Sequence, residues 1–130
     1  MNELISKAAQ KASQEEIFQA LAYAALKARA ARIAPNQIIR IGEFDLMVAD
    51  DENGDGLVVQ IILPREQMEG LALARARELD GSAEDWSEHE RREWLGAFWK
   101  ELALYLAKWQ NIKMRRGPGE NMTFEKAVSR

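Results

Sequence analysis

The first third of the chain has the hydrophobic spacing of an α-helix. Apolar residues recur there at intervals of three and four, at Ile17, Leu21, Ala24 and Ala28, which places them on one helix face. The residues Ser13 to Glu16 have the form of a capping box that begins this helix, and Pro35 stops it. The same period runs through residues 3–12, so these form either a separate short helix or the front of one long helix.

After Pro35 the period changes to that of β-strands. Residues 38–50 and 57–63 are rich in β-branched side chains and alternate between apolar and polar positions, which is typical of strands. The Asn53-Gly54 pair between them favours a type I′ hairpin turn. That turn would place Leu46 opposite Ile61 and two further apolar pairs on the same face. Gly42 interrupts the alternation and indicates a bulge.

Helical spacing returns after Pro64. One helix is expected to end at Asp80-Gly81, because glycine is common just after a helix. A second capping box at Ser87 begins the last helix, which is predicted to run over residues 87–116. Its apolar positions are mostly large and aromatic, and include Trp94, Leu95, Phe98, Trp99, Leu102, Tyr105, Leu106 and Trp109.

These elements predict an α+β fold. It has one or two N-terminal helices, an antiparallel β-hairpin at about 38–50 and 57–63, and two helices, of which the last, at about 87–116, is long and rich in aromatic residues. At 130 residues the chain has the length of a single domain, residues 1–130. Residues 117–130 are expected to be a flexible tail or a short docking helix.

The sequence DENGDGLV, residues 51–58, matches the start of an EF-hand calcium loop. An EF-hand needs a helix on each side and a bidentate carboxylate at loop position 12. Here strands flank the loop, and position 12 is Ile62, which cannot bind a metal ion. Asp, Asn and Gly are also the ordinary residues of an exposed turn, so we interpret this segment as a turn and expect no metal site.

Composition narrows the classes of protein. The net charge is −3 and the chain has no cysteine, which excludes disulfides, thiolate nucleophiles and thiolate zinc sites. No apolar segment has the length of a membrane span, and the first residues mix Lys with Glu instead of forming a secretory signal. We therefore expect a cytoplasmic protein that does not enter a membrane.

Catalytic motifs are missing from the sequence. The sole histidine, His89, lies four residues from both Asp85 and Glu93, but this spacing supplies neither HExxH nor a complete set of metal ligands. The serines lack a nucleophile elbow, and no glycine-rich phosphate loop is present. We expect no enzyme and no cofactor.

The last helix supplies the candidate residues for a protein partner. Most aromatic residues on such a helix belong to the core. This stripe, however, is wider than one helix face usually buries, and Trp and Tyr are enriched at binding hot spots. The candidates are Trp94, Phe98, Trp99, Tyr105 and Trp109, and a homodimer formed through this helix is the leading hypothesis for assembly.

Basic residues support an alternative. They cluster near the first helix and at the end of the last one, at Lys27, Arg29, Arg32, Arg40, Lys113, Arg115 and Arg116. Such residues could bind the phosphates of a nucleic acid. Cations also stabilise helix C-termini, where the helix dipole is negative, so the same residues have a purely structural interpretation.

We therefore expect a non-enzymatic binding protein that acts through contact with another protein. Small acidic chains without cysteine or catalytic motifs are common among phage- and plasmid-encoded accessory proteins, including inhibitors, which makes an inhibitor one form of this hypothesis. The alternatives are a nucleic-acid-associated protein that uses the basic residues and a small enzyme without a recognisable motif.

Overall fold

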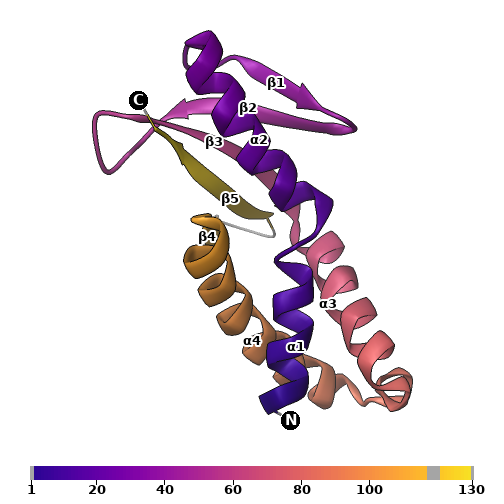
Figure 1. Ribbon diagram of the computed structural model, residues 1–130. Coiled ribbons are helices and arrows are strands. Elements are labelled where there is room, and N and C mark those ends of the chain that lie inside the picture. The colour runs from indigo at the N-terminus through magenta and orange to yellow at the C-terminus, as the bar shows by residue number, and fades with distance from the viewer. Residues whose placement is uncertain (1, 117–120, 130) are drawn as a thin grey trace.

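The computed structural model describes residues 2–116 and 121–129. In this part of the chain, helices precede the strands of one antiparallel sheet and separate β3 from β4, and the predicted α+β class is confirmed (Figure 1). The elements in chain order are α1 (Asn2–Ala12), α2 (Glu16–Ala31), β1 (Ile38–Ile41), β2 (Phe44–Asp50), β3 (Leu57–Pro64), α3 (Arg65–Leu79), the 3₁₀ helix η1 (Gly81–Asp85), α4 (Glu88–Tyr105), the π-helical turn η2 (Leu106–Gln110), β4 (Lys113–Arg116) and β5 (Asn121–Val128).

The sheet has five antiparallel strands in the order β1-β2-β3-β5-β4. Strand β3 is therefore central, β5 lies inside the sheet between β3 and β4, and β1 and β4 form the two edges. Helix α2 lies across one face of this sheet and contacts β1, β2, β3 and β5. Helices α1, α3 and α4 pack together beyond the end of the sheet, with α1 between the other two (Figure 1).

One hydrophobic core joins the sheet to the helices. Under α2, the rings of Phe18 and Phe124 meet edge to face with their centroids 5.1 Å apart, a favoured geometry for aromatic pairs. Among the helices, Trp94 is buried and its indole Nε1–H donates a hydrogen bond to Ala72 O at 3.1 Å. Large aromatic side chains therefore fill both halves of the core.

The predicted hairpin has the predicted register, but its turn is of a different type. Met47 pairs with Gln60 and Val48 with Val59, which is the register that the Asn53-Gly54 turn required. Neither turn residue has a positive φ, so the turn is not type I′. Instead Gly54 N–H donates to Asp51 O, and Asn53 N–H donates to Asp51 Oδ1 at 3.0 Å. The six-residue loop keeps the register because Asp51 N–H also closes it by a bond to Gly56 O.

Residues 38–50 form two strands instead of the single predicted strand. Gly42, with φ of 60°, is the first central residue of a two-residue turn that pairs Ile41 with Phe44. A positive φ at that position alone is the pattern of a type II′ hairpin turn, which favours glycine there. The predicted bulge at Gly42 is therefore wrong, and the sheet gains the edge strand β1.

The end of the chain also differs from the prediction. The last helix exists and carries the aromatic residues, but it gives way to η2 at Leu106 and ends at Gln110. Asn111, with φ of 52°, caps it in the left-handed conformation. Residues 113–116, predicted as helix, form β4, and the predicted tail contains β5. Residues 117–120 of that tail, and Arg130, lie outside the described residues.

The two predicted capping boxes have different outcomes. At Ser87 the box is present, because Ser87 Oγ accepts from Glu90 N–H and Glu90 Oε1 accepts from Ser87 N–H. At Ser13 it is wrong, because Ser13 Oγ donates back to Gln10 O and helix α2 has no side-chain cap. Ser13 thus belongs to the end of α1, and residues 3–12 form part of a separate helix.

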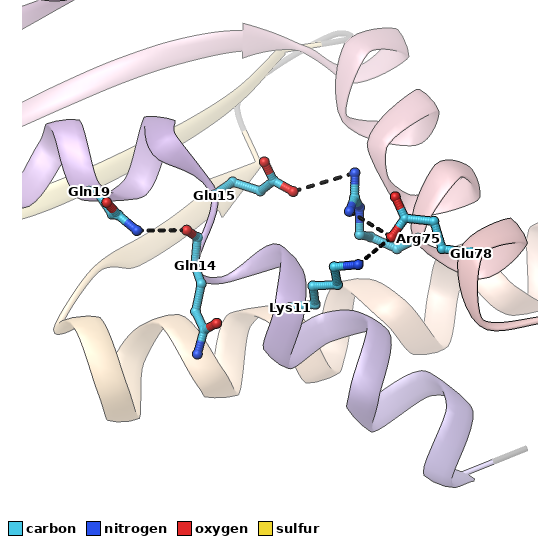
Figure 2. A network of polar contacts seen from close by, with 6 residues as sticks. All are labelled: Lys11, Gln14, Glu15, Gln19, Arg75 and Glu78. Carbon is cyan, nitrogen blue, oxygen red and sulfur yellow. Dashed lines mark hydrogen bonds and ion pairs between the residues drawn. The ribbon is translucent and has the colours of Figure 1, made fainter.

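A network of polar contacts holds the junction between α1 and α2 against α3 (Figure 2). Lys11 Nζ donates to Glu78 Oε2 at 2.6 Å, and Arg75 Nη1 donates to the same oxygen at 2.8 Å. Arg75 Nη2 also lies 3.5 Å from Glu15 Oε1. The hydrogen bond from Lys11, and to a lesser degree the charge of Arg75, lowers the pKa of Glu78.

Within the described residues, no helix combines the length and hydrophobicity needed to cross a membrane.

Candidate interaction surface

The face of the sheet opposite α2 exposes large apolar side chains. Successive residues of a strand point to opposite faces, so the neighbours of the buried residues Ile39, Leu46 and Ile61 point away from α2. These neighbours are Ile38 in β1, Met47 in β2 and Ile62 in β3, which are 64%, 41% and 54% exposed. We call Ile38, Met47 and Ile62 the apolar patch.

The register places the three residues of the patch side by side. Ile38 is directly opposite Met47. Met47 pairs with Gln60, so Ile62, two residues further along β3, is the diagonal neighbour of Met47. A shallow hollow of about 220 Å³ lies here, and its lining includes all three patch residues with Asp45 and Gln60. Three strands therefore contribute to one continuous apolar surface.

The charged side chains that border the patch form ion pairs within the chain. Arg40 Nη1 lies 3.7 Å from Asp45 Oδ1 beside Ile38 and Met47. On the β5–β4 side, Arg115 donates to Glu52 Oε2 at 3.0 Å and to Glu125 Oε1 at 3.4 Å. The hydrogen bond to Glu52, together with the charges of Glu52 and Glu125, raises the pKa of Arg115. The surface around the patch is consequently polar but nearly balanced in charge.

Three of the five predicted partner-binding residues lie in the core of this chain. Trp94, Phe98 and Trp99 are buried, because α1 and α3 cover the face of α4 that carries them. Tyr105 is half-buried, and its hydroxyl makes a hydrogen bond with Ser6 Oγ. The structure therefore assigns most of the aromatic stripe to the packing between helices.

Trp109 is the predicted partner residue that remains on the surface. It is 64% exposed and lies in the π-helical turn η2. Lys108 Nζ lies 5.5 Å from the centre of its ring, within the range of a cation–π contact. Leu104, in the last turn of α4, is also exposed. Two large apolar side chains are thus exposed near the C-terminal end of α4.

The predicted basic residues do not form one cluster. Lys27, Arg29 and Arg32 belong to α2 or its C-cap, whereas Arg40 is on β1. Lys113, Arg115 and Arg116 are on β4, and three strands separate the two edges. Arg40 and Arg115 are ion-paired.

Two of the basic residues, Arg29 and Arg32, line a hollow of about 680 Å³ together with apolar residues such as Leu57 and Val128. This hollow lies at the C-terminal end of α2, where the two guanidinium groups complement the negative end of the helix dipole.

The remaining candidates for chemistry are at the surface. His89 is exposed, and its Nε2 lies 3.0 Å from Glu93 Oε1 in the first turns of α4. In residues 2–116 and 121–129, no three His, Asp or Glu side chains converge as a metal site would require. The described carboxyl groups with shifted pKa values are Glu78 and Asp80, both lowered by hydrogen bonds, from Lys11 and Ser82 respectively.

Sequence reasoning missed the apolar patch. Ile38, Met47 and Ile62 had been assigned to a hairpin with one apolar face, yet each follows or precedes an equally apolar residue of the other face. The available signal was the presence of large apolar residues at some outward positions of the strands, since an exposed sheet face normally carries polar side chains there.

Comparisons with protein-family models, with curated proteins and with solved structures found no match to this chain.

Proposed function

We propose that this protein is a non-enzymatic binding protein that contacts another protein through the apolar patch. The observation that carries the proposal is the exposure of three large apolar residues, from three neighbouring strands, on the face of the sheet opposite α2, which no helix of residues 2–116 covers. An apolar surface of this kind, bordered by polar residues, marks interaction sites more often than ordinary surface does.

The chemistry of the partner follows from the charges. Arg40 is paired with Asp45 at the patch border, so an incoming charged group would compete with an existing ion pair. A partner segment that presents uncharged apolar side chains does not compete with this ion pair, and burial of the patch contributes favourable free energy to its binding. We therefore propose an apolar, uncharged segment of a protein as the ligand. A binding protein that contacts its partner in this way can act as an inhibitor of that partner, and this role of the chain stays a prediction.

Two arguments support binding over the alternatives. The described side chains with shifted pKa values are exposed ion-paired or turn residues, whereas catalytic groups with shifted pKa values gather in clefts. The basic residues that a nucleic acid would use are divided between α2 and the two edges of the sheet, whereas phosphate binding needs them on one surface.

The test selects peptides from a phage-displayed library against the full chain and measures their affinity by fluorescence polarisation. We expect selected peptides rich in apolar uncharged residues, and we expect Ile62→Lys and Met47→Lys to weaken binding by about tenfold or more, since buried contacts of this kind dominate affinity. Leu104→Lys is the matched control, because Leu104 is at least as exposed as Ile62 and Met47 but lies on α4. Its affinity should equal that of the unchanged protein.

Other results would contradict the proposal. Affinity that falls with Trp109→Ala but not with Ile62→Lys would move the contact to the end of α4. Binding of a DNA or RNA oligonucleotide that weakens steeply between about 50 and about 200 mM salt would favour the nucleic-acid alternative.

A further inference from the structure

Strand β1 has a free edge. It pairs with β2 on one side and forms one border of the sheet. In an antiparallel pair, the residues that bond to the neighbour alternate with residues whose N–H and C=O groups point away. Val48 N–H donates to Gln37 O at 2.9 Å, so the alternation assigns Ile39 and Ile41 to the bonds with β2. The N–H and C=O groups of Ile38 and Arg40 then point outward.

Apolar side chains flank this edge on both faces of the sheet. Ile38 is exposed on the uncovered face. On the other face, a hollow of about 490 Å³ lies between the β1–β2 turn and α2, and its lining includes Ile41, Phe44 and Tyr23. Tyr23 is 60% exposed. An unpaired edge bordered by apolar groups is a site for addition of another strand.

One stripe of α2 faces the same hollow and has opposite charges at its two ends. Glu16, Gln19 and Tyr23 line the hollow, and Lys27 continues the stripe one turn after Tyr23 because helix residues four apart share a face. Among the described residues neither Glu16 nor Lys27 forms an ion pair; the ion pairs found there involve other side chains. An antiparallel copy of this stripe would place each charge near its opposite.

We propose that a second copy of this chain binds the β1 edge, so that two β1 strands pair antiparallel about a twofold axis. Ile39 lies on the axis in this arrangement, and Ile38 of each copy is opposite Arg40 of the partner subunit. All the outward N–H and C=O groups of Ile38 and Arg40 are then bonded in both copies. The two sheets become one continuous sheet.

Neighbouring registers fit less well. A shift that puts Arg40 on the axis makes it face Arg40 of the partner subunit, and like charges directly opposite are destabilising. A shift that puts Ile38 on the axis needs the N–H of Asn36 for pairing. That group already donates to Val48 O at 2.7 Å. The register centred on Ile39 is the one that uses the outward groups and no others.

The same axis makes the two α2 helices antiparallel over one face of the joined sheet. The end of α2 that carries Glu16 then faces the end of α2 that carries Lys27 of the partner subunit, and by symmetry the same contact occurs twice in the dimer. This interface differs from the homodimer predicted from the sequence, because the aromatic residues of α4 are buried within each chain. It also brings the apolar patches of both copies onto one face, although the pairing itself does not depend on their binding a partner.

The test is a charge exchange measured by sedimentation velocity on the full chain. The unchanged protein should be dimeric at micromolar concentration. Glu16→Lys and Lys27→Glu should each weaken the dimer by about tenfold or more, because each puts like charges together twice in the symmetric dimer. An equimolar mixture of the two variants should form a heterodimer, since opposite charges meet again only in the mixed pair.

Controls separate this interface from a general effect of charge. Lys100→Glu, on the exposed side of α4, should leave the dimer unchanged. Arg40→Pro removes an outward N–H without removing a bond to β2, and an edge strand tolerates proline. It should give a folded monomer by circular dichroism and sedimentation. A monomeric unchanged protein, a mixture that stays monomeric, or a dimeric Arg40→Pro variant would each overturn the proposal.

Discussion

Leu46 and Met47 are neighbours in β2, yet Leu46 is fully buried beneath α2 and Met47 is exposed on the opposite face. The same contrast holds for Ile61 and Ile62 in β3, and for Ile39 and Ile38 in β1. Both faces of the sheet carry large apolar side chains near β1, β2 and β3, but among the described residues only one face is covered by a helix, α2. Apolar side chains of the same strands therefore belong either to the core or to the surface, and the position of α2 decides which of the two.

This comparison separates stability from binding. Side chains on the face under α2 should contribute strongly to the free energy of unfolding, because their removal leaves cavities in a packed core. Side chains of the apolar patch should contribute little to stability, because they are already in contact with water. Matched substitutions on the two faces test that difference.

The largest expected effect is on the covered face. Leu46→Ala should lower the free energy of unfolding by about 3 kcal/mol, whereas Met47→Ala should lower it by less than about 1 kcal/mol. Urea unfolding at constant m-value measures both changes. Equal losses for the two variants would mean that something covers both faces in solution, and a dimer or a bound partner would then need to be sought.

A smaller effect is expected from one aromatic contact of the covered face. Phe18 and Phe124 join α2 to the interior strand β5. A double-mutant cycle with Phe18→Leu and Phe124→Leu should give a coupling energy of about 1 kcal/mol, in the range of edge-to-face pairs. A coupling near zero would show that the two rings contribute only through the area that they bury.

A still smaller effect is expected from the ion pair on the uncovered face. Arg40 and Asp45 are both exposed, and such pairs usually contribute little because water and salt screen them. Asp45→Asn should change the free energy of unfolding by less than about 0.5 kcal/mol. If the loss is several times larger, the pair is shielded from solvent and the uncovered face is not open to water.

The smallest effect is expected outside the sheet, and it should disappear in acid. Because folding lowers the pKa of Glu78, its contacts with Lys11 and Arg75 stabilise the fold above the pKa of an unfolded glutamate, about 4.3. This contribution decreases as the pH falls through that value and is lost below the lower folded pKa. Glu78→Gln should be slightly less stable than the unchanged protein at neutral pH.

The two proteins should converge in acid, once the pH is below the lowered pKa of Glu78 in the folded protein and its carboxyl group is protonated. Urea midpoints measured from neutral pH to about pH 3 provide the comparison. A constant difference over the whole range would mean that the charge of Glu78 does not stabilise the contact between α1 and α3, and that another property of the substitution is responsible.

Much of the local structure could be predicted because it depends on neighbouring residues. The three-and-four spacing around Leu21 predicted α2, and the alternation in residues 38–50 and 57–63 predicted two strands that contain β2 and most of β3, although β1 was included in the first of them. Their register was correct although the turn type was wrong, since apolar pairing across the strands fixes register independently of the turn. Ser87 capped its helix as predicted because a capping box is formed by four consecutive residues.

The errors arose where distant residues make the choice. Residues 121–128 have no strong local pattern, yet β5 lies inside the sheet because it pairs with all of β3, from Leu57 with Val128 to Pro64 with Asn121, and with β4 on its other side. The aromatic stripe of α4 looked too wide to be covered, but α1 and α3 together cover Trp94, Phe98 and Trp99. Both outcomes require contacts between parts of the chain that are far apart in sequence.

The sequence by itself therefore determined the helices around Leu21 and Trp94, the β2–β3 register and the absence of thiol chemistry, because periodicity and composition are local properties. The tertiary structure decided which apolar face of the sheet is buried and which strand edge is free. Leu46 and Met47 are both apolar, so the hydrophobic pattern of the sequence does not distinguish them. Only the packing of α2 on one side of the sheet makes Leu46 a core residue and Met47 a surface residue.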